Sequence, residues 1–223
     1  MAAPKVEPKI YTAVVLDFET GGLNCVDCAC TQLAMQAVRL DNWTVLERYA
    51  KYIAPYRKLD IGGAPKRKVL KTRQALVQEE AGMSMKYEPV ALTYSAITMD
   101  MLYNQGVDLK EVAQDVIEFG KRNTLSKGQQ CKPILIGQNI TFDIGFLQQL
   151  IAYAGLMPEF EKVFAGKVDF YGNFQPHYVD TIDLGRFAFA HLPDVTSYKL
   201  EMLSERLGIE LDDAHDAGAD VTA

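Results

Sequence analysis

The sequence has no apolar run of about 18 residues, the length that a membrane-spanning helix needs. Residues 1–9 carry prolines and charges but no apolar core, so they do not resemble a signal peptide. We therefore expect no membrane contact and, by default, a cytoplasmic location.

Sulfur ligands for a metal ion are also scarce. Cys25, Cys28 and Cys30 lie close together, whereas Cys131, the fourth cysteine, is about a hundred residues away. A structural zinc site normally uses a second pair of ligands at a characteristic spacing, and no such pair accompanies this triplet. Reduced thiols without a metal are therefore favoured, and a zinc site stays the alternative.

An excess of positive charge is absent too, because 29 acidic residues against 23 lysines and arginines give a net charge of −6. This balance argues against a protein that coats nucleic acid over its whole surface. It does not exclude a nuclease, because a nuclease concentrates its acids where metal ions offset them. The 223 residues, 48% hydrophobic, predict one large domain over 1–223 with ample material for a core.

The most informative stretch is 14–23, Val-Val-Leu-Asp-Phe-Glu-Thr-Gly-Gly-Leu, which predicts a buried strand ended by a Gly-Gly break. Asp17 and Glu19 are two positions apart, so in a strand both side chains point to one face, about 7 Å apart. Two acids there repel each other unless a cation compensates, and a hard divalent metal ion is the obvious candidate. A single Asp-x-Glu pair is common, however, and solvated loop acids are the simpler interpretation.

Neighbouring segments predict a mixed sheet. Residues 31–54 alternate around the turn pair Asp41-Asn42 as a β-hairpin. Residues 109–122 have apolar residues at helical spacing, and the apolar strand predicted at 132–137 follows this helix. A strand after a helix indicates a crossover to a parallel partner, hence an α/β protein.

The C-terminal third continues the alternation. Residues 179–181 indicate a short strand, and 183–190 and 199–207 indicate helices. We expect the second helix to turn its apolar residues inward, namely Leu200, Met202, Leu203 and Leu207.

Residues 137–147 predict a strand-to-helix junction, with Asp143 in the first helical turn beside an apolar stripe. The simpler interpretation is an acid favoured there by the helix dipole. The alternative is a third carboxylate at the carboxyl edge of the sheet, where open α/β sheets place their ligands. Asn139 is placed to hold the backbone or a substrate at the same edge.

The last stretch, 212–221, is rich in small residues that let a helix approach another backbone closely. His215 and Asp220 are its candidates for chemistry, although a single histidine near an acid is usually structural.

Three short motifs follow one another along the chain: Asp17-x-Glu19, Asn139-x-x-Phe142-Asp143 and His215-x-x-x-x-Asp220. Together they resemble the motifs of the DEDDh 3′–5′ exonucleases, the DnaQ-like group that includes the DNA polymerase III epsilon subunit and ribonuclease T. The joint occurrence of three motifs is specific, whereas any one of them is not. The resemblance implies a ribonuclease H-like fold, with a five-stranded mixed sheet flanked by helices.

The resemblance also implies an active site with two Mg²⁺ or Mn²⁺ ions. Its ligands would be the carboxylates of Asp17, Glu19, Asp143 and Asp220, and His215 would be the general base that deprotonates the attacking water. Two cations about 4 Å apart stabilise both the entering and the leaving oxygen of phosphodiester hydrolysis. Carboxylate oxygens suit Mg²⁺, and a histidine with a pKa near 6.5 suits proton removal near neutral pH.

For the substrate, the resemblance places Thr20, Gly22 and Leu23 at the terminal nucleotide, with Leu23 as a wedge against the base. Phe142 would stack on the sugar or on a neighbouring base, and Asn139 is the other expected substrate-binding residue. The implied activity is release of nucleoside monophosphates from 3′ ends, with single-stranded DNA favoured in a proofreading or repair role. An exoribonuclease that trims RNA 3′ ends, and a non-catalytic module that binds 3′ ends, are the alternatives.

The resemblance does not cover residues 57–94, which we predict to be an insertion. This segment is basic over 57–73, where it either contacts phosphates or forms a solvated face. The chain ends three residues after Asp220, where a family helix would continue, so we expect a truncated C-terminus. A polymerase partner bound through the missing segment and a homodimer both stay open.

Overall fold

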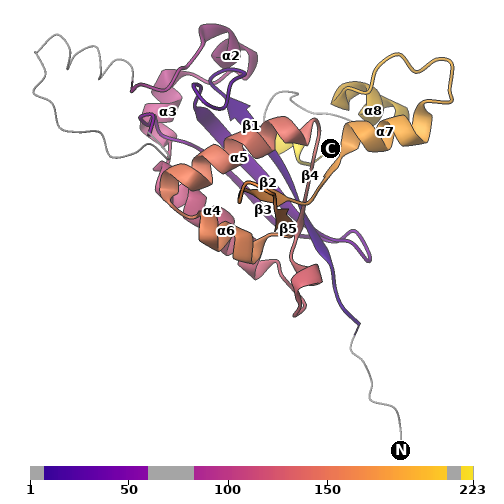
Figure 1. Cartoon of the computed structure of the whole chain (residues 1–223). Helices are drawn as coiled ribbons and strands as arrows, with labels where there is room; N and C mark the ends of the chain where they lie inside the picture. The colour runs from indigo at the N-terminus through magenta and orange to yellow at the C-terminus, as the bar shows by residue number, and fades with distance from the viewer. Residues whose placement is uncertain (1–7, 60–82, 210–216, 223) are drawn as a thin grey trace, which may run out of the picture.

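The computed structural model describes residues 8–59, 83–209 and 217–222 (Figure 1). His215 lies outside the described residues. So does most of the predicted basic cluster, namely Lys66, Arg67, Lys68, Lys71 and Arg73.

A five-stranded sheet in the order β3-β2-β1-β4-β7 forms the centre of the molecule. Its strands are β1 (Thr12–Thr20), β2 (Cys30–Arg39), β3 (Val45–Tyr52), β4 (Ile134–Gly137) and β7 (Tyr178–Asp180). The first three strands are antiparallel, whereas β4 runs parallel to β1 and β7 runs parallel to β4. The predicted five-stranded mixed sheet of an α/β protein is confirmed, including the hairpin and the crossover.

The central strand β1 separates two environments by simple alternation. Val14, Leu16 and Phe18 are buried in the main hydrophobic core, whereas Asp17 and Glu19 are half-buried on the opposite face. This is the period of two that a strand imposes on its side chains. The two acids therefore share one face, as their spacing predicts.

Short helices surround the sheet: α2 (Pro89–Tyr94), α3 (Met99–Gln105), α4 (Leu109–Arg122), the 3₁₀ turn η1 (Gln129–Cys131), α5 (Ile140–Ala154), α6 (Met157–Val163), α7 (Thr181–Phe189), α8 (Leu200–Leu207) and α9 (Ala217–Asp220). A two-stranded ribbon of β5 (Gly166–Val168) and β6 (Phe174–Pro176) follows α6. In Figure 1, α4, α5 and α6 lie together along the sheet, whereas α7 and α8 extend to one side.

The main core lies between the sheet and the helices α4, α5 and α6. Helix α4 has the predicted bounds, and the Asp108 carboxylate caps its start by accepting a hydrogen bond from the Lys110 N–H at 2.9 Å. Gly120 permits close packing of α4 on α6, because a Cβ there would lie 2.5 Å from a methyl group of Val163.

Helix α8 differs from the expectation in one respect. Met202 and Leu207, predicted to face inward, are 43% and 60% exposed, and only Leu203 among the four is buried. Leu203 packs against Gly185 of α7, where an added Cβ would lie 2.8 Å from its methyl group. The apolar spacing predicted the helix correctly, but a single helix of nine residues covers only part of its apolar side.

Within the three described ranges, no helix combines the length and apolar character needed to cross a membrane.

Candidate active site

Three carboxylates from two distant parts of the chain meet at one end of β1. One oxygen each from Asp17, Glu19 and Asp220 lies within 4.8 Å of the other two. Asp17 and Glu19 come from β1, and Asp220 comes from the last turn of α9. Carboxylates so close repel one another strongly unless a positive charge lies between them.

Small side chains bring α9 against the sheet. Ala34 of β2 is the direct neighbour of Asp17 across the β1–β2 pair. Ala217 of α9 packs against Ala34, and its N–H donates a hydrogen bond to the Gln32 side-chain oxygen at 3.3 Å. Because neither alanine holds the backbones apart, Asp220 reaches the two acids of β1.

Asp143 supplies a fourth carboxylate from the first turn of α5, where the sequence predicts it. The side chain is buried, and it accepts a hydrogen bond from the Phe18 N–H at 3.0 Å. Burial, followed by the negative charge of Asp17, raises the pKa of Asp143 well above its usual value. A carboxyl group whose pKa is raised this strongly is more typical of a functional site than of a structural one.

A cavity of about 620 Å³ opens over these acids. Every predicted site residue in the described part of the chain lines it: Asp17, Glu19, Thr20, Gly22, Leu23, Asn139, Phe142, Asp143 and Asp220. The structure thus brings these residues together, and their individual roles stay predictions.

No family model matches the chain. Two curated relatives are DNA polymerase III PolC-type from Oceanobacillus iheyensis and from Bacillus cereus, 25% and 26% identical over 212 residues. Each match covers 95% of this chain and 11% of the relative, so the chain spans about a tenth of the length of these relatives.

Solved structures of E. coli exonuclease I share the fold. The complex with a dT13 oligonucleotide has a TM-score of 0.64 at 20% identity, over 95% of this chain and 39% of that chain. The ExoI/SSB-Ct complex has a TM-score of 0.61 at 18% identity, over 95% and 40%. The predicted resemblance to exonucleases is confirmed, because the chain shares the fold of exonuclease I and resembles DNA polymerase III PolC-type in sequence. The likeness in structure also confirms the ribonuclease H-like fold.

In this exonuclease-like chain, α2 adds cavity residues that sequence reasoning missed. Val90 and Tyr94 line the cavity and are 82% and 65% exposed, and Leu23, on the loop after β1, is 86% exposed. A local signal was available, because Pro89 occupies the first turn of α2, where proline favours helix initiation. No local signal indicated that this helix, inside the predicted insertion, borders the acids.

The loop that follows β1 is tightly constrained. The Thr20 hydroxyl donates a hydrogen bond to the Gly22 carbonyl at 2.8 Å, so the predicted substrate-binding threonine also holds this turn. Gly22 has a φ of +154°, and a Cβ there would lie 2.7 Å from the Cys28 sulfur. Glycine is therefore required at position 22, which lies between the acids and Leu23.

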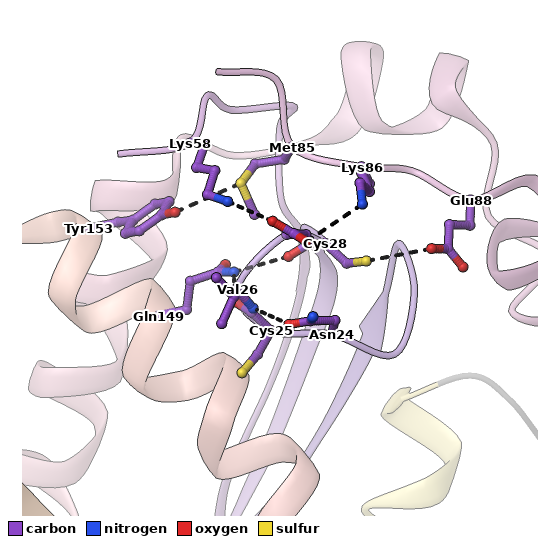
Figure 2. A network of polar contacts seen from close by, with 11 residues as sticks. Asn24, Cys25, Val26, Cys28, Lys58, Met85, Lys86, Glu88, Gln149 and Tyr153 are labelled. Carbon is purple, nitrogen blue, oxygen red and sulfur yellow. Dashed lines mark hydrogen bonds and ion pairs between the residues drawn. The ribbon is translucent and has the colours of Figure 1, made fainter. Parts of the chain in front are cut away.

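The buried side chain of Gln149, on α5, anchors the same loop (Figure 2). Its amide nitrogen donates hydrogen bonds to the carbonyl oxygens of Cys25 and, at 3.0 Å, of Cys28. Its amide oxygen accepts one from the Tyr56 hydroxyl at 2.6 Å. One amide thus ties the loop to α5, the helix whose first turn contains Asp143.

Ion pairs fix the outer side of the loop. The Asp27 carboxylate accepts a hydrogen bond from the Lys58 ammonium at 2.6 Å and lies 3.5 Å from the Lys86 ammonium. The Lys58 contact, above all, lowers the pKa of Asp27. Lys58 belongs to the predicted basic cluster, and it contacts an acid of this protein.

The cysteines after β1 do not form a metal site with other ligands in the described residues, where the only suitable group is the acidic cluster. Cys28 and Cys30 are buried, Cys25 is half-buried, and all are free thiols. Burial raises the pKa of the Cys30 thiol to about 12, which keeps it protonated at neutral pH. These observations favour reduced thiols over the zinc alternative.

Replacing Gln149 by leucine removes the anchor while keeping an apolar volume. We expect the free energy of unfolding to fall by about 2–4 kcal/mol, because the carbonyls of the buried Cys28 and the half-buried Cys25 and the Tyr56 hydroxyl lose their partner. Urea unfolding measures this loss. Gln148→Leu is the matched control, because Gln148 is half-buried and donates one hydrogen bond, to the Phe174 carbonyl. Equal losses in both variants would contradict the anchoring role.

Proposed function

We propose that this protein is a divalent-metal-dependent 3′–5′ exonuclease that acts on single-stranded DNA and releases nucleoside monophosphates. The observation that carries this proposal is the convergence of Asp17, Glu19 and Asp220, with the buried Asp143 beside them. Two comparisons support DNA as the substrate: the curated relatives are DNA polymerases, and a structural relative is complexed with a dT13 oligonucleotide.

The donor set fits Mg²⁺ or Mn²⁺. The cluster offers carboxylate oxygens only, which hard divalent cations prefer. Asp17, Glu19 and Asp220 would hold one ion, and Asp143 with Asp17 would hold a second. Bound ions would stabilise the charge that develops on the phosphate oxygens and lower the pKa of the attacking water.

The chain itself positions the reacting groups. The Phe18 N–H orients the Asp143 carboxylate, and the Gln149 anchor holds the loop that presents Leu23. Exposed apolar groups on Leu23 and Tyr94 give unpaired bases a surface to stack on, which favours single strands over duplex ends. His215, two residues before α9 in the sequence, is proposed as the general base that accepts the proton of the attacking water.

We also propose that residues 1–223 form one domain with an insertion around 57–94, which contains α2. A polymerase partner is suggested by the names of the curated relatives. An RNA substrate stays an alternative that the substrate comparison below addresses, and a homodimer stays an open alternative.

Metal binding should stabilise the folded protein. We expect Mg²⁺ or Mn²⁺ to raise the Tm of the wild-type protein, because a ligand at about 100 times its Kd adds about 2.7 kcal/mol. Asp17→Asn should lose most of this shift. Asp100→Asn, an exposed acid on α3, is the matched control and should keep it. Thermal unfolding with titrated metal ions provides the measurement, and a shift that survives in Asp17→Asn would place the ions elsewhere.

Substrate preference separates the candidate activities. With added Mg²⁺ or Mn²⁺, we expect nucleoside monophosphates from single-stranded DNA, slower release from the mispaired 3′ end of a duplex, and none with a chelator. Matched single-stranded DNA, single-stranded RNA and a duplex with a 3′ mispair are the three substrates. Faster cleavage of RNA would favour the exoribonuclease, and no cleavage with either metal would favour the non-catalytic module.

The proposed base can be separated from the proposed metal ligands. His215→Ala should lower kcat by about 10²–10⁴-fold, the usual contribution of a general base. The metal-induced rise in Tm should persist in this variant, because the histidine is not a ligand in this proposal. A loss of metal binding as large as that of Asp17→Ala would overturn the assignment.

A further inference from the structure

A second cavity, of about 700 Å³, lies where α4 ends and the chain returns toward β4. Four lysines line it, namely Lys121, Lys127, Lys132 and Lys162, and no acidic residue does. In a chain with a net charge of −6, four cations around one cavity form a local reversal of sign. We call these residues the lysine pocket.

Elsewhere in the described ranges, seven of the thirteen lysines and arginines form an ion pair, including Lys86 with Asp27. Ion pairs link Arg39 to Asp41, Lys51 to Asp115, Lys58 to Asp27, Arg122 to Glu47, Arg186 to Asp183 and Arg206 to Asp194. In the pocket only Lys121 has such a partner, Glu118 at 2.8 Å. Lys127, Lys132 and Lys162 form no ion pair within the described ranges.

One of these lysines is held in place. Lys132 is half-buried, and its ammonium donates a hydrogen bond to the Glu161 carbonyl at 2.9 Å. Burial lowers its pKa, so the charged form is partly desolvated without a compensating acid. An anion that binds beside such a fixed ammonium group stabilises its charged form.

Helix ends explain only half of the cluster. Lys121 and Lys162 lie in the last turns of α4 and α6, where the helix dipole favours cations. Lys127 and Lys132 lie outside both helices, on either side of η1. Their convergence on the same cavity needs another reason.

The lysine pocket and the acidic cavity lie at opposite ends of β1. The Ile10 N–H donates to the Ser126 hydroxyl at 2.7 Å, and the Thr12 hydroxyl donates to the Asn123 carbonyl at 2.7 Å. These bonds tie the start of β1 to the segment that lines the pocket. At about 3.3 Å per residue, Asp17 lies about 20 Å further along this part of the chain.

Resting on the proposed function, we propose that the lysine pocket is a second phosphate-binding site, which holds the backbone of a single DNA strand whose 3′ end occupies the acidic cavity. No aromatic residue lines the pocket, so it contacts phosphates and not bases. A stacked strand advances about 3.4 Å per nucleotide, so about six nucleotides span the two sites. The contribution of the pocket therefore depends on strand length and not on sequence.

The test uses strands of about 4 and about 20 nucleotides, shorter and longer than the expected span. Asp17→Asn serves as the background so that bound strands are not cut. In this background, Lys127, Lys132 and Lys162 are all changed to Gln, and fluorescence anisotropy gives Kd over a range of salt concentrations. We expect the long strand to bind roughly tenfold more weakly, with a salt slope reduced by about 2, because each phosphate contact on a single strand contributes about 0.7. The affinity for the short strand should not change.

Controls separate this site from net charge and from misfolding. Changing Lys110, Lys167 and Lys199 to Gln makes the same change in charge outside the pocket, and should leave the affinity for the long strand nearly unaltered. Replacing the three pocket lysines by arginine keeps the charge and should retain tight binding. The proposal would be overturned if both glutamine sets weakened DNA binding equally, or if the pocket set weakened binding of both strand lengths equally. It would also be overturned if poly-glutamate competed with the long strand for the protein while the pocket glutamine set left the affinity for DNA unchanged.

The outcome is independent of cleavage. If the wild-type protein cuts no strand but the glutamine set still weakens long strands selectively, the proposed activity fails and the lysine pocket stands. If cleavage occurs and the glutamine set changes no affinity, the lysine pocket fails and the activity stands.

Discussion

Electrostatic repulsion among carboxylates is the constraint on which this structure depends. Asp17, Glu19 and Asp220 present oxygens within 4.8 Å of one another, and Asp143 is buried beside them. Such an arrangement lowers the stability of the protein unless a cation neutralises it. The surrounding elements hold the arrangement in place: strand alternation aligns two acids, two alanines admit α9, and the Phe18 N–H orients Asp143.

The surroundings of the acids follow from the same need for rigidity. A loop beside repelling charges would move away unless it were anchored, and here one buried amide, Gln149, binds it from α5 while Asp27 fixes it from outside. Gly22 passes too close to Cys28 for any side chain. The exposed side chains of Leu23 and Tyr94 line the same cavity as the acids, so the cavity has an apolar side next to its charged side.

Charge is distributed unevenly over the molecule. The acids gather at one end of β1, and cations without an acidic partner in the described ranges gather near the other end, around Lys132. A polyanion would be repelled by the net charge of −6 but attracted by this second region. As proposed above, the two ends of one strand would act on one ligand, with the acidic end selecting the terminus.

Local features of this protein were determined by the sequence alone. The spacing of Asp17 and Glu19, the bounds of α4 and the position of Asp143 in a first helical turn follow from periodicity and capping, which involve near neighbours. The motif resemblance extended the prediction from these local features to the whole set of acids. Tertiary structure decided the rest: Asp220 reaches the acids through Ala34, α2 borders the cavity, and Leu207 stays exposed. These outcomes depend on which distant surfaces meet, and no local spacing contains that information.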